Sequence, residues 1–321
     1  AFGCFAQGVA KPDQGSLAGL VKTAALEWPE VNCLAIDTDP AWDAEAAAEA
    51  VAEEILHLGV ESPGEVGLTP KGRYGLALLP SPAPSGQLGL EDDDIVLISG
   101  GARGVTAATA LALAQAAPVR LVLLGRTPAP EPEPQWLAGL KDPAEMKRAL
   151  MTHGFDTSPS PKELEARFHH HQSQRDIQAT LDALSDAGGG TRAEYHAVDI
   201  RDAGAVSALV GQLRTNGGRI RALIHGAGVL EDRFIEDKTM RQFDRVFATK
   251  VAGLDALLAA TAADDLRQIV LFSSVSGRMG NSGQVDYAMA NEVLNKTAHQ
   301  ISVARPDCRV VAINWGPWDG G

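Results

Sequence analysis

Three side chains in one short stretch of the sequence could together perform acid–base chemistry on a carbonyl group. Ser274 follows the apolar run 268–272, and the glycines after it predict a loop. Tyr287 and Asn291 stand in the segment that turns helical from Asp286. Residues four apart share one face of a helix, so we expect Tyr287 and Asn291 on the same side. A phenol beside a hydroxyl can give a proton to a carbonyl oxygen that receives a hydride. The alternative is a serine that caps a helix and a tyrosine packed in the core, and this stretch alone leaves both open.

Buried strands that alternate with helical stretches must position these side chains. The predicted strands are 94–99, 119–124, 195–199, 222–225, 268–272 and 309–313. Repeated strand–helix units of this kind indicate the α/β class, with a doubly wound parallel sheet of the Rossmann type. In such folds ligands bind at the carboxyl ends of the strands, which is where Ser274 lies.

A linker rich in proline, 80–87, divides the sequence into two predicted domains. Residues 1–88 read as a helix (16–28), a strand (32–37), a helix (44–58) and a hairpin (66–79), with no phosphate-binding glycine loop, and we interpret them as a structural subdomain. Residues 89–321 form the predicted catalytic domain. Within it, 128–190 is longer than a crossover needs and contains two helical runs, 142–151 and 162–184, so we expect a helical insertion on the surface.

Composition excludes several classes of function. A net charge of −13 argues against nucleic-acid binding, and no apolar run reaches the roughly 18 residues that span a membrane. The cysteines, Cys4, Cys33 and Cys308, are far apart, so we expect buried thiols in a reducing, cytoplasmic compartment and no zinc site. The histidines 169–171 favour a solvated helix face over a metal site. The chain starts without methionine and ends abruptly, so we expect it to be part of a longer polypeptide.

A cluster of glycines between the first strand of the second domain and the next helix is typical of a dinucleotide site. Gly100, Gly101, Arg103, Gly104 and Val105 would form a loop whose backbone approaches a pyrophosphate at the helix N-terminus. A third glycine is expected two positions after Gly104, and Thr106 stands there instead.

Further candidates for cofactor binding follow the next strands. No acidic residue ends the second strand; Arg126 stands there instead, and with Arg103 it favours the 2′-phosphate of NADPH over NADH. Asp199 and Ile200 close the third strand, where the carboxylate would either bind the adenine or cap the following helix. The fourth strand ends in small residues against which a flat cofactor could lie, namely Gly226, Ala227 and Gly228.

Taken together, these motifs resemble a ketoreductase domain of the short-chain dehydrogenase type, as found in modular polyketide synthases and animal-type fatty acid synthases. The resemblance is carried by Gly100–Gly104, His225–Val229, Phe272–Ser274, Tyr287–Asn291 and Asn314–Trp318. The N-terminal segment with Ala-Ala-Leu-Glu-Trp resembles the structural subdomain that precedes such reductases. The insertion and the glycine loop are most similar to the ketoreductase of polyunsaturated fatty acid synthases.

The resemblance assigns roles to individual residues. It implies that Tyr287 is the proton donor, that Ser274 binds the substrate carbonyl, and that Lys250 and Asn291 complete a catalytic tetrad with exchanged positions. The Lys250 ammonium would lower the pKa of Tyr287 and hold the ribose, and Pro317 would contact the cofactor. Asp232, in Leu-Glu-Asp, matches the aspartate that marks B-type reductases, whose product is the D-3-hydroxyacyl (3R) thioester.

The function expected from this resemblance is NADPH-dependent reduction of a 3-ketoacyl thioester carried by an acyl carrier protein, within a larger synthase. Two alternatives remain at this point. One is a free-standing dehydrogenase of small alcohols or sugars, and the other is a scaffold domain that binds cofactor without turnover. The sequence indicates neither the length of the acyl chain nor the oligomeric state.

Overall fold

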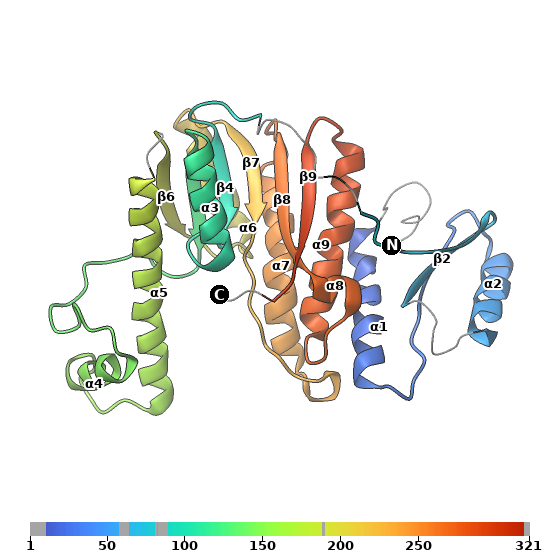
Figure 1. Ribbon diagram of the computed structural model, residues 1–321, viewed down its shortest axis with the longest axis horizontal. Coiled ribbons are helices and arrows are strands. Elements are labelled where there is room, and N and C mark those ends of the chain that lie inside the picture. Colours follow the sequence, from blue (N-terminus) through green and yellow to red (C-terminus); the bar gives the residue numbers. More distant parts are fainter. Residues whose placement is uncertain (1–10, 58–63, 81, 83–88, 188–189, 318–321) are drawn as a thin grey trace. The chain divides into compact units, whose positions relative to one another are not determined.

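Strands of buried aliphatic residues form the centre of each of two units in the computed structural model. The continuous unit comprises residues 91–199, and the split unit comprises residues 1–90 and 200–319. The structure describes residues 11–57, 64–80, 82, 89–187 and 190–317. Each unit contains a set of three adjacent parallel strands, and together with the helices they confirm the predicted α/β class (Figure 1).

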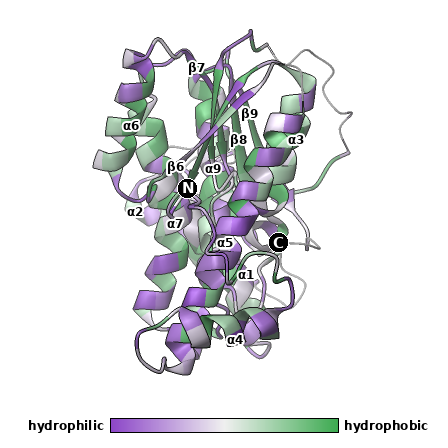
Figure 2. Ribbon diagram, turned by 90° about the vertical axis from the view of Figure 1, so that its left-hand side faces the viewer, coloured by the Kyte–Doolittle hydropathy of each residue, from purple (hydrophilic) through white to green (hydrophobic). Residues whose placement is uncertain are grey.

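In the continuous unit the strand order is β6-β5-β4, all parallel. The elements are β4 (Ile95–Ser99), α3 (Gly104–Ala116), β5 (Arg120–Gly125), α4 (Pro143–His153), α5 (Pro161–Asp186) and β6 (Arg192–Ala197). Every residue of β4 is buried, as the continuous apolar run predicts. Helices α4 and α5 lie in the predicted insertion, and hydrophilic residues dominate α5 (Figure 2).

In the split unit the strand order is β7-β8-β9, again parallel. The elements after residue 200 are α6 (Ala203–Thr215), β7 (Ile220–His225), the short helix η2 (Ile235–Asp237), α7 (Met240–Ala260), β8 (Gln268–Ser274), α8 (Val275–Met279), α9 (Val285–Ala304) and β9 (Arg309–Trp315). Strand β8 pairs with β9 so that Ser274 lies opposite Trp315. The predicted loop after Ser274 is wrong in part, because α8 begins directly at residue 275.

The N-terminal part of the split unit matches the predicted elements closely. It contains η1 (Pro12–Gly15), α1 (Ser16–Glu27), β1 (Ala35–Thr38), α2 (Ala44–Leu56), β2 (Glu65–Thr69) and β3 (Gly72–Gly75). Strands β2 and β3 form the predicted hairpin, and β1 pairs with β2 in parallel.

Helix α1 packs directly against α9, the helix that carries Tyr287 and Asn291. The approach is so close at Gly19 that a Cβ atom there would lie 2.6 Å from the carbonyl oxygen of Ala288. A glycine is therefore needed at this crossing, since any larger residue would push the two helices apart.

Buried ion pairs reinforce this contact between the N-terminal elements and α9. Lys22 of α1 donates to Glu65 of β2 at 2.9 Å, and Lys296 of α9 lies 3.7 Å from the other oxygen of the same carboxylate. Lys296 also pairs with Glu292 at 3.2 Å, and Arg278 of α8 pairs with Glu292 at the same distance. Burial alone would raise the pKa of Glu65, but the Lys296 and Lys22 ammonium groups outweigh it and lower that pKa overall.

The predicted domain boundary near residue 88 coincides with the start of the continuous unit. The N-terminal elements before it form one compact unit with residues 200–319. The division into a structural subdomain and a catalytic domain stays a prediction. Among the described residues, no helix has the length and apolar character needed to cross a membrane.

Candidate active site

Ser274 ends β8 and is at the same time the N-cap of α8. Its hydroxyl accepts from the backbone N–H of Ser276 at 3.2 Å and donates toward the Ser276 hydroxyl and the carbonyl oxygen of Trp315. The side chain is buried, with 8% of its surface exposed. The structure therefore confirms that Ser274 caps a helix at the carboxyl end of a parallel strand, and its role in catalysis stays a prediction.

Tyr287 and Asn291 lie one turn apart on α9, as their spacing predicts. Burial raises the pKa of the Tyr287 phenol, and hydrogen bonding to the side chains of Asn291 and Ser274 offsets part of that rise. The amide nitrogen of Asn291 donates to the Tyr287 carbonyl oxygen at 2.8 Å. Its amide oxygen is buried and has no hydrogen-bond partner among the described residues.

Lys250 reaches this cluster from α7. Its ammonium lies 5.2 Å from the centre of the Tyr287 ring and donates to the carbonyl oxygen of Phe272 at 2.9 Å. Burial lowers the pKa of Lys250 to about 8. The structure thus brings the four predicted catalytic residues together, but the net shift of the Tyr287 pKa is upward, opposite to the lowering that we expected from Lys250.

His225, at the end of β7, supports Lys250 through the backbone. Its Nε2 atom lies 2.9 Å from the carbonyl oxygen of Lys250, and because a carbonyl can only accept, Nε2 must carry the proton. Burial, together with the Lys250 charge, lowers the pKa of His225 to about 3. The imidazole is therefore neutral and fixes one tautomer at any physiological pH.

Asp232 lies in the loop after β7 and joins the cluster through Gln284. The amide nitrogen of Gln284 donates to both carboxylate oxygens of Asp232, at 3.2 and 3.1 Å, while the amide oxygen accepts from Ser276 and Asn281. The Asp232 charge also contributes to the raised pKa of Tyr287. The residue that the resemblance links to stereochemistry is therefore tied to the same hydrogen-bond network as Ser274.

Three residues that we did not predict hold the loops around this cluster. Glu27, the last residue of α1, accepts from the backbone N–H of Ile235 with one oxygen and from that of Gly283 with the other, each at 2.7 Å. Lys238 and Asp286 form a buried ion pair at 2.7 Å, and Asp286 also accepts from the N–H of Tyr287. Burial raises the pKa of Asp286, and the Lys238 ammonium counteracts it in part.

Two of the remaining predicted cofactor residues of the split unit, Gly228 and Ile200, lie near Lys250 or the next turn of its helix. A Cβ atom on Gly228 would lie 3.2 Å from Cε of Lys250, so the small residue leaves room for the lysine. Ile200 is buried and packs against Gly253, one turn after Lys250 on α7. The other predicted residues of this unit are Gly226, Ala227 and the exposed Pro317.

In the continuous unit, the predicted glycine loop joins β4 to α3. Gly100 and Gly104 have φ angles of 73° and 57°, in the region that favours glycine. No side chain caps the N-terminus of α3, whereas at α4 and α5 the N-cap side chain accepts a hydrogen bond from a backbone N–H of the first turn. Uncapped N–H groups at a helix start attract a phosphate, so the loop fits a dinucleotide. The alternative that Asp199 caps the next helix is wrong, because Asp202 does so.

The two arginines predicted to bind a 2′-phosphate differ in their surroundings. Arg103 donates to the hydroxyl of Ser173 on α5 at 2.9 Å. Arg126 follows β5, is exposed, and makes no hydrogen bond or ion pair with the described residues. Both guanidinium groups therefore remain on a surface that an anionic ligand can reach.

A match to a family model shows which protein family this chain belongs to. Residues 95–320 match the KR domain. The chain belongs to the ketoreductase family. This match includes every residue of the predicted catalytic tetrad, and it supports the oxidoreductase chemistry that the cluster suggests.

Two relatives that match nearly the whole chain are synthases, and this chain spans only a small part of each. One polypeptide of a polyunsaturated fatty acid synthase from a Thraustochytrium species is 34% identical over 98% of this chain, which spans 12% of that polypeptide. Polyketide synthase ThaG of Burkholderia thailandensis is 30% identical over 94% of the chain, which spans 5% of it. The ketoreductase from the first module of phoslactomycin biosynthesis in Streptomyces sp. HK803 has a TM-score of 0.73 at 25% identity; the alignment covers 99% of this chain and 62% of that one.

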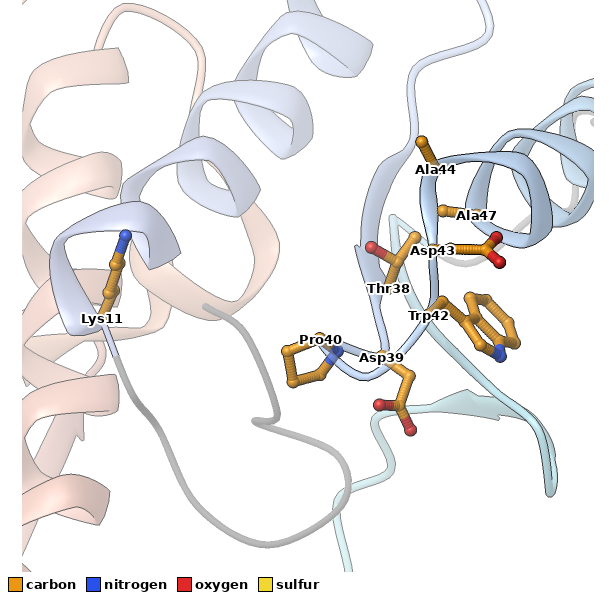
Figure 3. Close-up of a pocket in the computed structure, with 8 residues that line it drawn as sticks. All are labelled: Lys11, Thr38, Asp39, Pro40, Trp42, Asp43, Ala44 and Ala47. Carbon is orange, nitrogen blue, oxygen red and sulfur yellow. The ribbon is translucent and has the colours of Figure 1, made fainter.

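Other features fall outside this cluster. The pocket in Figure 3 lies at the turn between β1 and α2 and contains none of the predicted site residues. His169 is exposed on α5, and the described residues contain no group of three or more side chains suited to a metal ion. Cys308 is buried as expected, Cys33 is half-buried, and Cys4 lies outside the described residues.

Proposed function

We propose that this ketoreductase uses NADPH to reduce a 3-ketoacyl thioester, held by an acyl carrier protein, to the D-3-hydroxyacyl thioester. The observation that carries the proposal is the cluster around Tyr287, where a half-buried phenol interacts with Ser274 and Asn291 and has the Lys250 ammonium beside its ring. The family match supports ketone reduction, and the relatives in multidomain synthases support a carrier-bound substrate.

Tyr287 and Ser274 have different roles at the ketone oxygen. Tyr287 donates its proton to the developing alkoxide, and its raised pKa keeps it protonated until then. The Ser274 hydroxyl donates a second hydrogen bond to the same oxygen. Hydrogen bonds that are already oriented before the reaction stabilise the developing charge, which is the largest electrostatic contribution such a site makes.

The residues present also fit the proposed cofactor. When bound, NADPH supplies the hydride that reduces the ketone carbon. The uncapped start of α3 with Gly100 and Gly104 would bind the pyrophosphate, and Arg103 and Arg126 the 2′-phosphate. One N–H of the Lys250 ammonium is used by Phe272, so the others can hold ribose hydroxyls. The unpartnered amide oxygen of Asn291 is an acceptor that a water or a cofactor hydroxyl can satisfy.

The expected stereochemistry rests on Asp232. Its carboxylate is held by Gln284, which also interacts with Ser276 next to the catalytic serine. A substrate that enters beside this loop meets a fixed negative charge, and the side of the ketone offered to reduction would follow from it.

Replacement of Tyr287 by Phe tests the proposal most directly. We expect Tyr287→Phe to reduce turnover of a 3-ketoacyl thioester by at least about a hundredfold, because general acid catalysis contributes roughly that factor or more. NADPH binding, followed by nicotinamide fluorescence, should change little. Tyr74→Phe, at an exposed tyrosine of β3, is the matched control and should behave like the unmodified protein.

The carrier and the stereochemistry are tested on the unmodified protein. Chiral chromatography of the product should show the D isomer in excess, and a carrier-bound 3-ketoacyl chain should give a higher kcat/KM than the same chain on free pantetheine. Full turnover in Tyr287→Phe would overturn the catalytic assignment, whereas an excess of the L isomer would overturn only the B-type assignment.

A further inference from the structure

The helical insertion contacts the glycine loop through α5. Arg103 donates from Nη1 to the Ser173 hydroxyl at 2.9 Å, and Thr180 donates from its hydroxyl to the carbonyl oxygen of Ala102 at 2.9 Å. Ser173 and Thr180 are seven apart, two turns along one face of the helix. A segment that an ordinary strand–helix crossover does not need is thus bonded to the loop proposed to bind the cofactor.

The insertion is built firmly enough to act as a positioning element. Leu137, Met146, Leu150 and Phe168 form a small buried core of their own. Arg175, two residues after Ser173, donates to both carboxylate oxygens of Glu133 and to the carbonyl oxygens of Leu137 and Leu140. A capping box of Ser160 and Glu163 fixes the start of α5. The position of Ser173 is therefore determined by packing and by a guanidinium clamp beside it.

Helix α5 also contacts the segment that follows β5, where Arg126 stands. Gln174 donates to the carbonyl oxygen of Ala129 at 3.4 Å, and the Tyr195 phenol donates to the carbonyl oxygen of Thr127 at 2.7 Å. Burial raises the pKa of Tyr195 and the Arg103 charge counteracts it, which places the guanidinium near this phenol. Ser173 thus lies beside Arg103 on a helix that also borders the segment carrying Arg126.

The hydrogen bonds of α5 leave the Ser173 hydroxyl and the backbone N–H of Arg103 available to bind an anion. The Ser173 hydroxyl accepts from Arg103, and its own hydrogen has no acceptor among the described residues, so it can be donated to a phosphate oxygen. The Thr180 hydroxyl, which also lies 3.0 Å from the carbonyl oxygen of Asp176, contacts the carbonyl of Ala102 and directs it toward α5. Because the carbonyl and the next N–H of a trans peptide point in opposite directions, the N–H of Arg103 points away from α5.

We propose that α5 is part of the cofactor site, in which Ser173 orients Arg103 and donates a hydrogen bond to the 2′-phosphate of NADPH. This inference rests on the proposed function. Ser173 is a selectivity residue for the phosphorylated cofactor, and Thr180 is a positioning residue for the glycine loop.

Titration of the unmodified protein and its variants with NADPH and with NADH, followed by nicotinamide fluorescence, tests the assignment without any turnover. Ser173→Ala should weaken NADPH binding by about tenfold, the effect of one hydrogen bond to a charged group, and should leave NADH binding unchanged. Thr180→Val should weaken both cofactors to a similar extent. Gln178→Ala is the control on the same helix, because within the described part of the chain its side chain bonds only to Asp182, one turn away.

A double variant sharpens the assignment. If Ser173 acts together with Arg103, then Ser173→Ala combined with Arg103→Ala should weaken NADPH binding little more than Arg103→Ala alone. The inference alone would be overturned by the following result. The unmodified protein prefers NADPH, and the Ser173→Ala variant either keeps the full preference or loses affinity for both cofactors equally. An unmodified protein that binds neither cofactor would overturn the proposed function itself.

Discussion

At the scale of single residues, Ser274 combines two tasks in one hydroxyl. Its oxygen caps α8 by accepting from Ser276, and its hydrogen, now directed at the Ser276 hydroxyl and the Trp315 carbonyl oxygen, would turn toward a bound substrate. Loss of an N-cap hydroxyl costs about 1 kcal/mol of stability, so replacement by alanine removes a structural bond along with the proposed catalytic one. The cap also explains why α8 starts directly at residue 275, where the glycines of the sequence predict a loop.

Lys250 gives the site a dependence on alkaline pH. Its pKa of about 8 means that the ammonium is charged at pH 7 and is lost as the pH rises through 8. We expect the reduction rate with NADPH to fall above about pH 8, because a neutral amine holds the ribose hydroxyls less firmly. Initial rates from pH 6 to pH 10, at a fixed excess of substrate, measure this; a rate that stays constant up to pH 10 would exclude the charged lysine from the reaction.

His225 gives the fold a dependence on acidic pH. Because its pKa is lowered to about 3 in the folded protein, it stays neutral where the unfolded chain, with a pKa near 6.5, already takes up a proton. Stability is therefore lost as the pH falls from 6.5 toward 3. Between pH 7 and pH 5 this group should account for up to about 2 kcal/mol of the loss in the free energy of unfolding.

Replacement of His225 by Gln isolates that contribution. A glutamine amide can still donate to the Lys250 carbonyl oxygen but does not titrate. Urea unfolding of both proteins at pH 7 and pH 5 should show a smaller loss for His225→Gln. Equal losses in the two proteins would mean that another group controls the acid range.

At the scale of elements, the sequence predicts what depends on local periodicity. Spacing alone is enough to place Tyr287 and Asn291 together, and the end of an apolar run is enough to place Ser274. The contacts of Glu27 could not be predicted in this way. Its partners are the backbone amides of Ile235 and Gly283, 208 and 256 positions away, and backbone amides leave no signature in a sequence. The only sequence signal for Glu27 is its place in the N-terminal segment Ala-Ala-Leu-Glu-Trp, which resembles the structural subdomain that precedes ketoreductases.

Glu27 is expected to hold the two loops beside the active site in register. Removal of its carboxylate in Glu27→Ala leaves the N–H groups of Ile235 and Gly283 without an acceptor, so both loops should open more often. Hydrogen exchange measured by NMR or mass spectrometry should show faster exchange of these two amides. We also expect a lower excess of the D product, because Asp232 and Gln284 lie in the same loops.

The exposed Glu30, three residues further on, provides the control. Glu30→Ala should leave exchange at both amides unchanged. Unchanged protection of Ile235 and Gly283 in Glu27→Ala would show that the loops are held by other contacts, such as the bond between the Arg233 N–H and the Gly283 carbonyl.

At the scale of the whole molecule, the buried ion network joins the N-terminal elements to α9, the helix that carries Tyr287 and Asn291. Glu65 faces both Lys22 and Lys296, and its side chain is 9% exposed. In Glu65→Gln two buried ammonium groups lose their shared counter-charge, so we expect the free energy of unfolding to fall by about 3 kcal/mol. Chemical denaturation measures it.

An exposed pair provides the comparison for this prediction. Asp93 and Arg192 lie 3.4 Å apart with 64% and 73% of their side chains exposed. Asp93→Asn should cost less than about 1 kcal/mol, because solvent screens such pairs. If Glu65→Gln costs no more than Asp93→Asn, the network contributes little to the attachment of the N-terminal elements.

The sequence also predicts the fold class and the order of the strands along the chain, because apolar runs and glycine loops are local signals. It could not assign the N-terminal elements to the unit of the active site. That assignment rests on close contacts such as Gly19 against Ala288 and on ion pairs between residues far apart in sequence. Long-range complementarity of this kind becomes visible only when the elements are placed in space.

The split unit has a consequence for how the protein is synthesised. Residues 91–199 are continuous in sequence, whereas α1 must wait for its partner α9 until more than 250 further residues have been made. During that interval α1 lacks the helix against which it packs, and Glu65 lacks Lys296, one of its two cationic partners. A growing chain of this protein therefore carries α1 unprotected until α9 emerges, and molecular chaperones that bind nascent chains would act on that segment first.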